Sequence, residues 1–169
     1  SFARYMRRYD QMDPRARQGA ARALAKIDAS MLDRLAGEVA SLDSSRRLKA
    51  LSIVEFIDAG AAMREPLLEL LSDPDPTVRA TTIGIVELTG NMEGMKLLIG
   101  LLTDRDRRVR ANAVEAFEQL EDRRYVQLLT PFLRDPDNRV RANAAKALWN
   151  LGWEEARDEL VEMLADPDD

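Results

Sequence analysis

Apolar residues recur along this chain at intervals of three and four, which is the spacing of one buried face of an α-helix. Stripes of this kind occupy residues 67–71, 78–86 and 98–102. No alternation of apolar and polar residues persists for long enough to predict a strand, and no glycine lies in a strand-like context. The pattern therefore predicts an all-α chain.

The helical pattern repeats every 31 residues. The segment Asp-Pro-Asp-Pro-Thr-Val-Arg-Ala at 73–80 recurs in related form at 104–111 and 135–142, and another Asp-Pro-Asp begins at residue 166. Weaker copies precede them, because residues 16–24 align with 140–148 at four periods and residues 48–50 supply a second copy. Each period predicts a helix pair. The first helix begins at the aspartate segment, where Asp can cap it and Pro fits its first turn.

Residues 1–169 are predicted to form one domain of about five helix pairs with partial repeats at both ends. The expected boundaries are a partial repeat at 1–10, repeats at about 11–42, 43–72, 73–103, 104–134 and 135–165, and the start of a further repeat at 166–169. Phe2, Tyr5 and Tyr9 lie four periods before the apolar positions of a second helix. We therefore expect a fragment of a longer protein; the alternative is a capping helix that happens to be in phase.

One column of the repeat is basic in all five copies, namely Arg17, Lys49, Arg79, Arg110 and Arg141. We expect a structural ladder in which these side chains reach helix-end carbonyls and the aspartates Asp75, Asp106 and Asp137. Ligand binding by the arginines is the alternative, and the ladder is favoured because a residue present at one phase of every repeat is more often structural.

Two further positions carry local predictions. Asn112 and Asn143, two residues after the ladder arginine, are expected to hydrogen-bond to the preceding loop. Pro131 removes a backbone donor within a second helix, so it should kink or shorten that helix.

These features resemble HEAT repeats, and most closely the short bacterial kind of roughly 31 residues often labelled phycobilisome-lyase-like. The resemblance lies in the Asp-Pro-Asp-x-x-Val-Arg-Ala segment, the Ala-rich first helix and the second-helix sequence Glu-Pro-Leu-Leu-Glu-Leu-Leu at 65–71. It covers nearly the whole chain. It implies a right-handed, armadillo-like α-solenoid whose second helices line a concave face, and such scaffolds usually bind other proteins.

If the second helices face a groove, Leu97 and Leu128 form a small apolar centre with a charged rim, which is the anatomy of an interface. The alternative is that both leucines belong to the core. The candidate partner-binding residues are Glu65, Glu69, Met92, Lys96, Leu97, Arg124, Gln127, Leu128, Asp158 and Glu162. Trp149 and Trp153 either form a hot spot or pack against a missing sixth repeat.

The amino-acid composition excludes several classes of catalytic and metal-binding site. The chain has no Cys and no His, which excludes disulfides, thiolate or imidazole zinc sites and Ser–His or Cys–His catalysis. No glycine-rich phosphate loop or metal-ligand cluster appears, so we expect neither cofactor nor metal. No apolar run approaches about 18 residues and no signal peptide is visible, so we expect a cytoplasmic protein.

Charge is uneven along the chain. The net charge is −5, yet residues 1–49 carry eleven Lys or Arg against six Asp or Glu. Residues 154–169 carry eight acids and one Arg, a distribution that disfavours nucleic acid and could steer head-to-tail association through cut solenoid ends.

We predict a non-enzymatic protein-interaction scaffold, whose partner is another protein or another domain of the parent chain. The alternatives are a HEAT-like enzyme such as a DNA glycosylase, which would place carboxylates beside Trp149, and a bilin lyase or chaperone-like subunit, which rests on the family resemblance alone.

Overall fold

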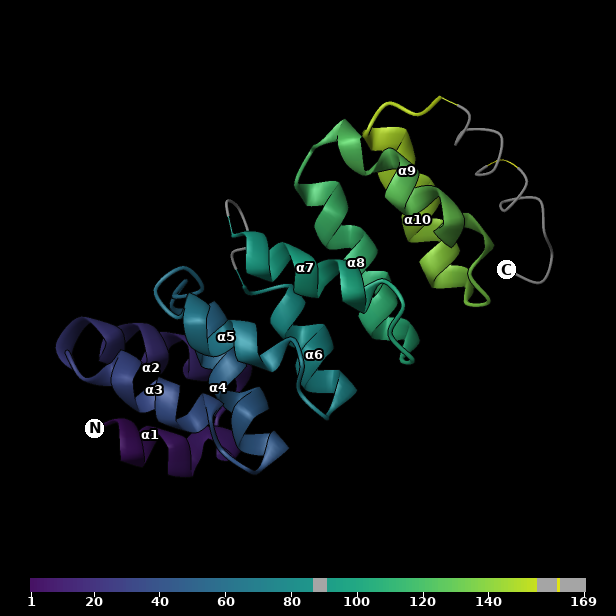
Figure 1. Cartoon of the computed structure of the whole chain (residues 1–169). Coiled ribbons are helices and arrows are strands. Elements are labelled where there is room, and N and C mark those ends of the chain that lie inside the picture. The colour runs from purple at the N-terminus through teal and green to yellow at the C-terminus, as the bar shows by residue number, and fades with distance from the viewer. Residues whose placement is uncertain (87–90, 155–160, 162–169) are drawn as a thin grey trace. The chain divides into compact units, whose positions relative to one another are not determined.

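A computed structural model of the chain describes residues 1–86, 91–154 and 161, and every regular element within these ranges is a helix. The chain divides into two compact units, Ser1–Glu87 and Leu88–Asp169 (Figure 1). The predicted all-α fold is confirmed. The predicted last second helix and the start of a further repeat fall largely outside the described residues.

In the first unit, α2, α4 and α6 are first helices, and α1, α3 and α5 are second helices. Helix α4 packs against α2, α3 and α6, while α5 packs against α3 and α6 (Figure 1). The elements are α1 (Phe2–Arg8), the 3-10 helix η1 (Tyr9–Gln11), α2 (Pro14–Ile27), α3 (Met31–Val39), α4 (Ser44–Phe56), α5 (Arg64–Leu70) and α6 (Pro76–Ile83).

In the second unit, α8 and α10 pack along each other and the second-helix segments lie against them. The elements are α7 (Met92–Leu101), α8 (Arg107–Gln119), η2 (Arg123–Tyr125), α9 (Val126–Leu129), η3 (Thr130–Arg134) and α10 (Asn138–Asn150). Helix α9 is only four residues long and passes into a 3-10 segment that has Pro131 in its first turn. The prediction that Pro131 shortens this helix is confirmed.

Each first helix begins at an aspartate that accepts a hydrogen bond from a backbone N–H of the first turn, as an N-cap does. The caps are Asp13, Asp43, Asp75, Asp106 and Asp137. Proline follows the cap in α2 and α6, whereas Pro136 precedes the cap of α10. The caps lie 30, 32, 31 and 31 residues apart, so they give the repeat register directly.

Three of the first helices end in the same way, at the fifteenth residue after the cap. Asp58, Glu121 and Gly152 occupy this position with φ values of 54°, 51° and 81°. After Asp58 and Gly152 the next N–H bonds back across the helix end, from Ala59 to the Val54 carbonyl at 3.0 Å and from Trp153 to the Leu148 carbonyl at 2.9 Å, which is the Schellman arrangement. Gly152 is the residue best suited to this left-handed conformation, because it has no Cβ.

The buried residues of the first helices occupy the same positions in each repeat when residues are counted from the capping aspartate. Positions 7, 8 and 11 after the cap are buried in α4, α8 and α10 and in the α6 segment, for example Ala113, Val114 and Phe117 at 0% exposure. The second helices bury a matching stripe made of Leu35, Leu67, Leu98 and Leu129. Thr82 is the polar member of these columns, and its hydroxyl donates to the Val78 carbonyl at 2.7 Å.

The aromatic residues near the N-terminus belong to this core. Phe2, Tyr5 and Tyr9 are all buried, as their phase in the repeat predicts. The Tyr5 hydroxyl donates to the Arg17 carbonyl at 2.9 Å, and the Arg17 guanidinium lies 4.6 Å from the centre of the Tyr9 ring. Burial, followed by the neighbouring Tyr9, raises the pKa of Tyr5 from 10.0 to about 12.

The raised pKa predicts an alkaline loss of stability. Between pH 10 and pH 12 the unfolded chain ionises Tyr5 while the folded chain does not, so stability that is complete below pH 10 is lost as pH rises through this window. Tyr5→Phe should remove that pH dependence and cost about 1 kcal/mol at neutral pH through the lost hydrogen bond. Urea unfolding at several pH values, with Tyr125→Phe as the control, measures both effects; an unchanged alkaline slope in Tyr5→Phe would contradict the assignment.

Candidate functional site

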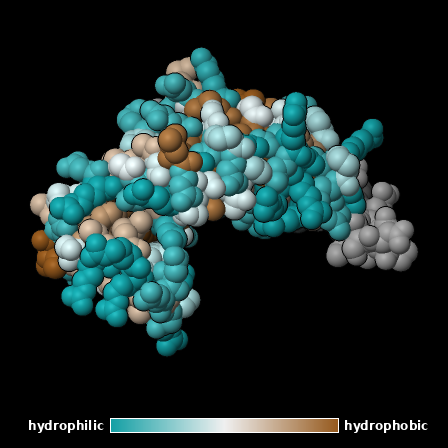
Figure 2. Space-filling model, turned by 90° about the horizontal axis from the view of Figure 1, so that it is seen from below, coloured by the Kyte–Doolittle hydropathy of each residue, from teal (hydrophilic) through white to brown (hydrophobic). Residues whose placement is uncertain are grey.

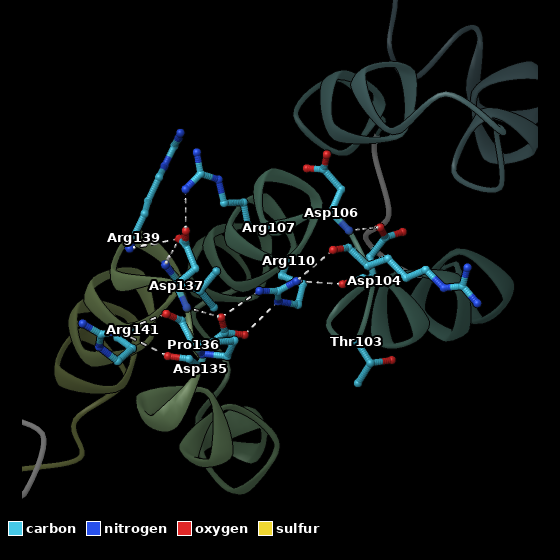
Figure 3. A network of polar contacts seen from close by, with 12 residues as sticks. Thr103, Asp104, Asp106, Arg107, Arg110, Asp135, Pro136, Asp137, Arg139 and Arg141 are labelled. Atoms are coloured by element: carbon cyan, nitrogen blue, oxygen red, sulfur yellow. Dashed lines mark hydrogen bonds and ion pairs between the residues drawn. The ribbon is translucent and has the colours of Figure 1, made fainter.

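An arginine–aspartate contact joins consecutive repeats of the second unit. Arg110, on α8, donates through Nε and Nη2 to the two carboxylate oxygens of Asp135, each at 2.8 Å (Figure 3). Its Nη1 donates to the Asp104 carbonyl at 2.9 Å. Asp135 also accepts the Asp137 N–H at 2.9 Å. One guanidinium therefore ties the loop before its own helix to the loop before the next.

The first unit contains the same arrangement around a different residue from the one expected. Arg47 donates through Nη1 to the Ser41 carbonyl at 2.7 Å and reaches Asp73 with Nε and Nη2 at 2.7 and 2.9 Å. Both side chains of this pair are buried. Arg47 lies four residues after its cap, as Arg79, Arg110 and Arg141 do.

Lys49 is therefore wrongly placed in the ladder column. It lies six residues after the cap of α4, in the column of Asn112 and Asn143, and pairs with exposed Asp10. The preceding repeat is one residue shorter than the period, which shifts the alignment of the repeats here. The run Arg46-Arg47-Leu48-Lys49 contains three basic residues, so the sequence alone does not show which of them belongs to the ladder.

The remaining ladder arginines also contact loop carbonyls. Arg79 donates to the Asp73 carbonyl at 2.7 Å, and Arg141 approaches the Asp135 carbonyl at 3.3 Å. Arg17 differs, because its Nε donates to the Tyr9 carbonyl at 2.9 Å, eight residues back, across η1. The expected carbonyl contact is thus present at all four arginines of the predicted column.

The aspartates that were expected to pair with the ladder mainly cap helices. Asp75, Asp106 and Asp137 accept N–H bonds from the first turns of α6, α8 and α10. Hydrogen bonding from the Arg108 side chain, the largest cause, lowers the pKa of Asp106 to about 2. The carboxylate that pairs with Arg110 is instead Asp135, the first aspartate of its loop.

Electrostatics stabilise the Arg110–Asp135 pair in its charged form. Burial alone would raise the pKa of Asp135, but hydrogen bonds from Arg110 and from the Asp137 N–H outweigh it and hold this pKa below its ordinary value. The same contact raises the pKa of Arg110. The pair thus carries both charges at neutral pH.

Asn143 links two helices rather than a helix and a loop. Its Nδ2 donates to the Ala111 carbonyl at 3.1 Å, within α8. The expectation of a contact with the preceding loop is therefore wrong for Asn143, because close packing of α10 on α8 brings the helix carbonyl nearer.

The candidate binding residues of the first unit lie on α5. Glu65 and Glu69 are exposed on the helix side opposite buried Leu67. Glu69 and Pro66 line a cleft of about 400 Å³ together with Leu42, which is fully exposed. The buried Arg47–Asp73 pair forms part of the wall of this cleft. This cleft was not anticipated from the sequence, although Leu42 between polar neighbours was a visible signal.

The candidate residues of the second unit lie on α7 and on the η2–α9 segment. Met92 is 79% exposed, and Lys96 and Gln127 are also exposed. Leu97 and Leu128 are half-buried, which fits neither a purely core role nor a freely accessible apolar centre. Ile99 lies in the predicted buried stripe at 98–102, but it is 43% exposed. Hydrophobic and hydrophilic side chains are interspersed over the face shown in Figure 2.

Arg124 is exposed but already paired. Its guanidinium forks onto Asp122, with Nη2 to Oδ2 at 2.6 Å, and this hydrogen bonding lowers the pKa of Asp122 and raises that of Arg124. Its charge is therefore largely compensated within its own turn. Asp158 and Glu162, the other two candidates, lie outside the described residues.

The tryptophans and the neighbouring carboxylate were the basis of the enzyme alternative. Trp149 is 47% exposed and Trp153 is half-buried. Glu118, which precedes Trp149 by one repeat in the same column, accepts from Asn150 and pairs with Lys146 at 3.2 Å. This carboxylate therefore takes part in contacts between α8 and α10.

No group of three or more His, Cys, Asp or Glu side chains among the described residues could hold a metal ion. No described helix is long and apolar enough to cross a membrane.

Helix pairs stacked through a repeated arginine–aspartate contact define a helical-repeat protein of the α-solenoid class. Residues 64–133 and 95–169 match the HEAT repeats family, and because these segments cover more than half of the sequence, the chain belongs to that family. The fold is similar to the crystal structure of an engineered protein from the Northeast Structural Genomics Consortium, with a TM-score of 0.61 and 21% identity over 96% of this chain and 84% of that one. No curated protein matches the sequence.

The contact of Arg110 with Asp135 predicts that removal of the Arg110 side chain strongly lowers the free energy of unfolding. Arg110→Ala leaves the nearly buried Asp135 carboxylate without its cation, so unfolding should become easier by about 2–3 kcal/mol at pH 7. The difference should shrink as pH falls through the lowered pKa of Asp135, since a protonated carboxyl no longer needs the cation. Urea unfolding at pH 7 and at pH 3 tests this. Arg107→Ala, which removes a 73% exposed partner of Asp137, is the matched control and should cost much less.

The register predicts that Arg47, and not Lys49, supports the fold of the first unit. Arg47→Ala should lower the melting temperature by several degrees, because it leaves buried Asp73 unpaired. Lys49→Ala should leave it nearly unchanged, because the Asp10 side chain that it contacts is 68% exposed. Thermal unfolding followed by circular dichroism compares the two variants directly, and equal losses would contradict the revised register.

Proposed function

We propose that this chain is a protein-interaction scaffold that binds its partner through the exposed face of its second helices. The support is that each of these helices buries one column of side chains and exposes another. The column Leu35, Leu67, Leu98, Leu129 is buried in the core, while the column Asp33, Glu65, Lys96, Gln127 is exposed at these four described positions. A second column, Gly37, Glu69, Gly100, Pro131, is exposed as well.

The exposed side chains of the second helices differ in chemistry between the two units, and this gives each unit its own recognition character. Helix α5 offers two carboxylates, Glu65 and Glu69. Helix α7 offers Met92 and Ile99 with Lys96 between them, so apolar side chains flank a cation. Apolar side chains, Met among them, form the core of a protein interface, and polar or charged side chains form its rim. We infer that α7 contributes the larger part of the binding energy.

The partner is another protein or another domain of the parent chain, as HEAT repeats generally bind proteins. The phycobilisome-lyase-like subtype, a bacterial origin and a cytoplasmic location rest on the sequence alone. The glycosylase alternative gains nothing from Glu118, whose carboxylate is engaged by Lys146 and Asn150.

The proposal predicts a loss of partner binding without a loss of folding. Met92→Ser with Ile99→Ser removes the exposed apolar side chains of α7, and helical content and melting temperature should barely change. These positions are preferable to Leu97 and Leu128, whose partial burial would confuse a binding defect with a folding defect. Affinity purification from nuclease-treated lysate, read by quantitative mass spectrometry, measures which proteins each variant retains.

The matched control is Leu32→Ser with Trp149→Ser, which removes two exposed apolar side chains outside α7. We expect a protein retained by the wild type and by this control, and depleted about tenfold with the α7 variant, which corresponds to about 1.4 kcal/mol. Equal retention by all three proteins, or recovery of nucleic acid alone when nuclease is omitted, would refute the proposed surface.

A further inference from the structure

A second surface lies at the N-terminal end of the first unit, where α1 meets α2. A cleft of about 500 Å³ opens between α1 and α2. Tyr5, Met12, Leu24 and Ile27 line it as apolar side chains, and Ile27 is 80% exposed. Figure 2 shows hydrophobic side chains at the left end of the face, the side on which the N-terminal helices lie in Figure 1.

The open side of α2 carries positions that other first helices bury. Ala20 and Leu24 lie 7 and 11 residues after the cap of α2, and neither of them is buried. Their counterparts on α4 are Ala50 and Val54, and both are 0% exposed. The cleft is therefore a helix-packing surface without its helix. An apolar surface of this kind is a docking site when a complementary segment is at hand.

The rim of the cleft is basic. Arg4 and Arg8 line it from α1, and both are exposed. Neither guanidinium forms an ion pair with a carboxylate among the described residues. The first 49 residues carry a net charge of +5, so the field around the cleft has the same sign as its rim.

The sequence contains a segment of opposite charge with matching apolar positions. Residues 154–169 hold eight acids and one Arg, and Leu160, Val161 and Leu164 fall at helical spacing within them. Val161 is 58% exposed. We propose that the α1–α2 cleft of one copy docks the acidic C-terminal segment of a second copy, so that chains associate head to tail.

Two properties follow from this geometry. The contact is heterologous, because the head of one copy meets the tail of the next, so association continues beyond a dimer unless the assembly closes into a ring. It is also sensitive to salt, because the arginines on the rim are exposed and their attraction to carboxylates is screened within about 10 Å at 0.1 M salt.

Sedimentation velocity of the 169-residue chain tests the docking. At about 0.02 M salt the weight-average mass should rise with protein concentration past that of a dimer, and at about 0.5 M salt the chain should be largely monomeric. Arg4→Glu with Arg8→Glu should weaken association at low salt by about tenfold or more, because like charges then face each other. Both side chains are exposed, so circular dichroism should show an unchanged fold.

The matched control is Arg7→Glu with Arg15→Glu, which alters the net charge equally at exposed positions outside the cleft and should leave association nearly intact. Mixing the Arg4→Glu/Arg8→Glu chain with a Glu159→Lys/Glu162→Lys chain should restore association, because the reversed charges pair again. A wild-type chain that stays monomeric at low salt, association that ends at a dimer, or equal weakening by the control would each overturn the proposal. None of these outcomes alters the expected effect of Met92→Ser/Ile99→Ser, so the two surfaces are tested independently.

Discussion

The fold depends on the double role of the first aspartate in the loops that precede α6 and α10, Asp73 and Asp135. The Asp135 carboxylate accepts the N–H of Asp137, which shapes its own loop, and at the same time the fork of Arg110 from the preceding repeat. Arg110 in turn grips the carbonyl of Asp104. The start of α10 is thus held at a fixed distance from the start of α8, and the columns of the two helices meet in register.

This arrangement explains how so polar a contact can lie at the edge of the core. A buried carboxylate without partners would be costly, yet Asp135 accepts the guanidinium fork of Arg110 and a backbone N–H, and Asp73 accepts a backbone N–H and a hydrogen bond from Arg47 Nη2 within an ion pair. The column seven residues after the cap holds small side chains, such as Ala113 and Ala144 at 0% exposure, which let adjacent first helices approach closely.

The period, the helix caps and the shortening of α9 at Pro131 could be predicted because each follows from local rules of helix formation. The identity of the ladder residue in the second repeat could not, because Arg47 and Lys49 are both basic and only their distance from the Asp43 cap separates them. The partner of Arg110 was equally hidden, since both aspartates of the loop have the right charge and the choice depends on the position of the next loop in space.

The same division explains why the second helices are free to vary in chemistry. The loop contacts fix the register of consecutive repeats, and the core uses only one stripe of each second helix. The exposed columns of the second helices are therefore not constrained by packing. One exposed column consists of Asp33, Glu65, Lys96 and Gln127, and the other of Gly37, Glu69, Gly100 and Pro131. The position four residues after the cap, by contrast, is arginine after all five caps. A repeat that fixes its geometry through one contact can change its exposed face without changing its shape, and this makes such a face suitable for recognising a partner.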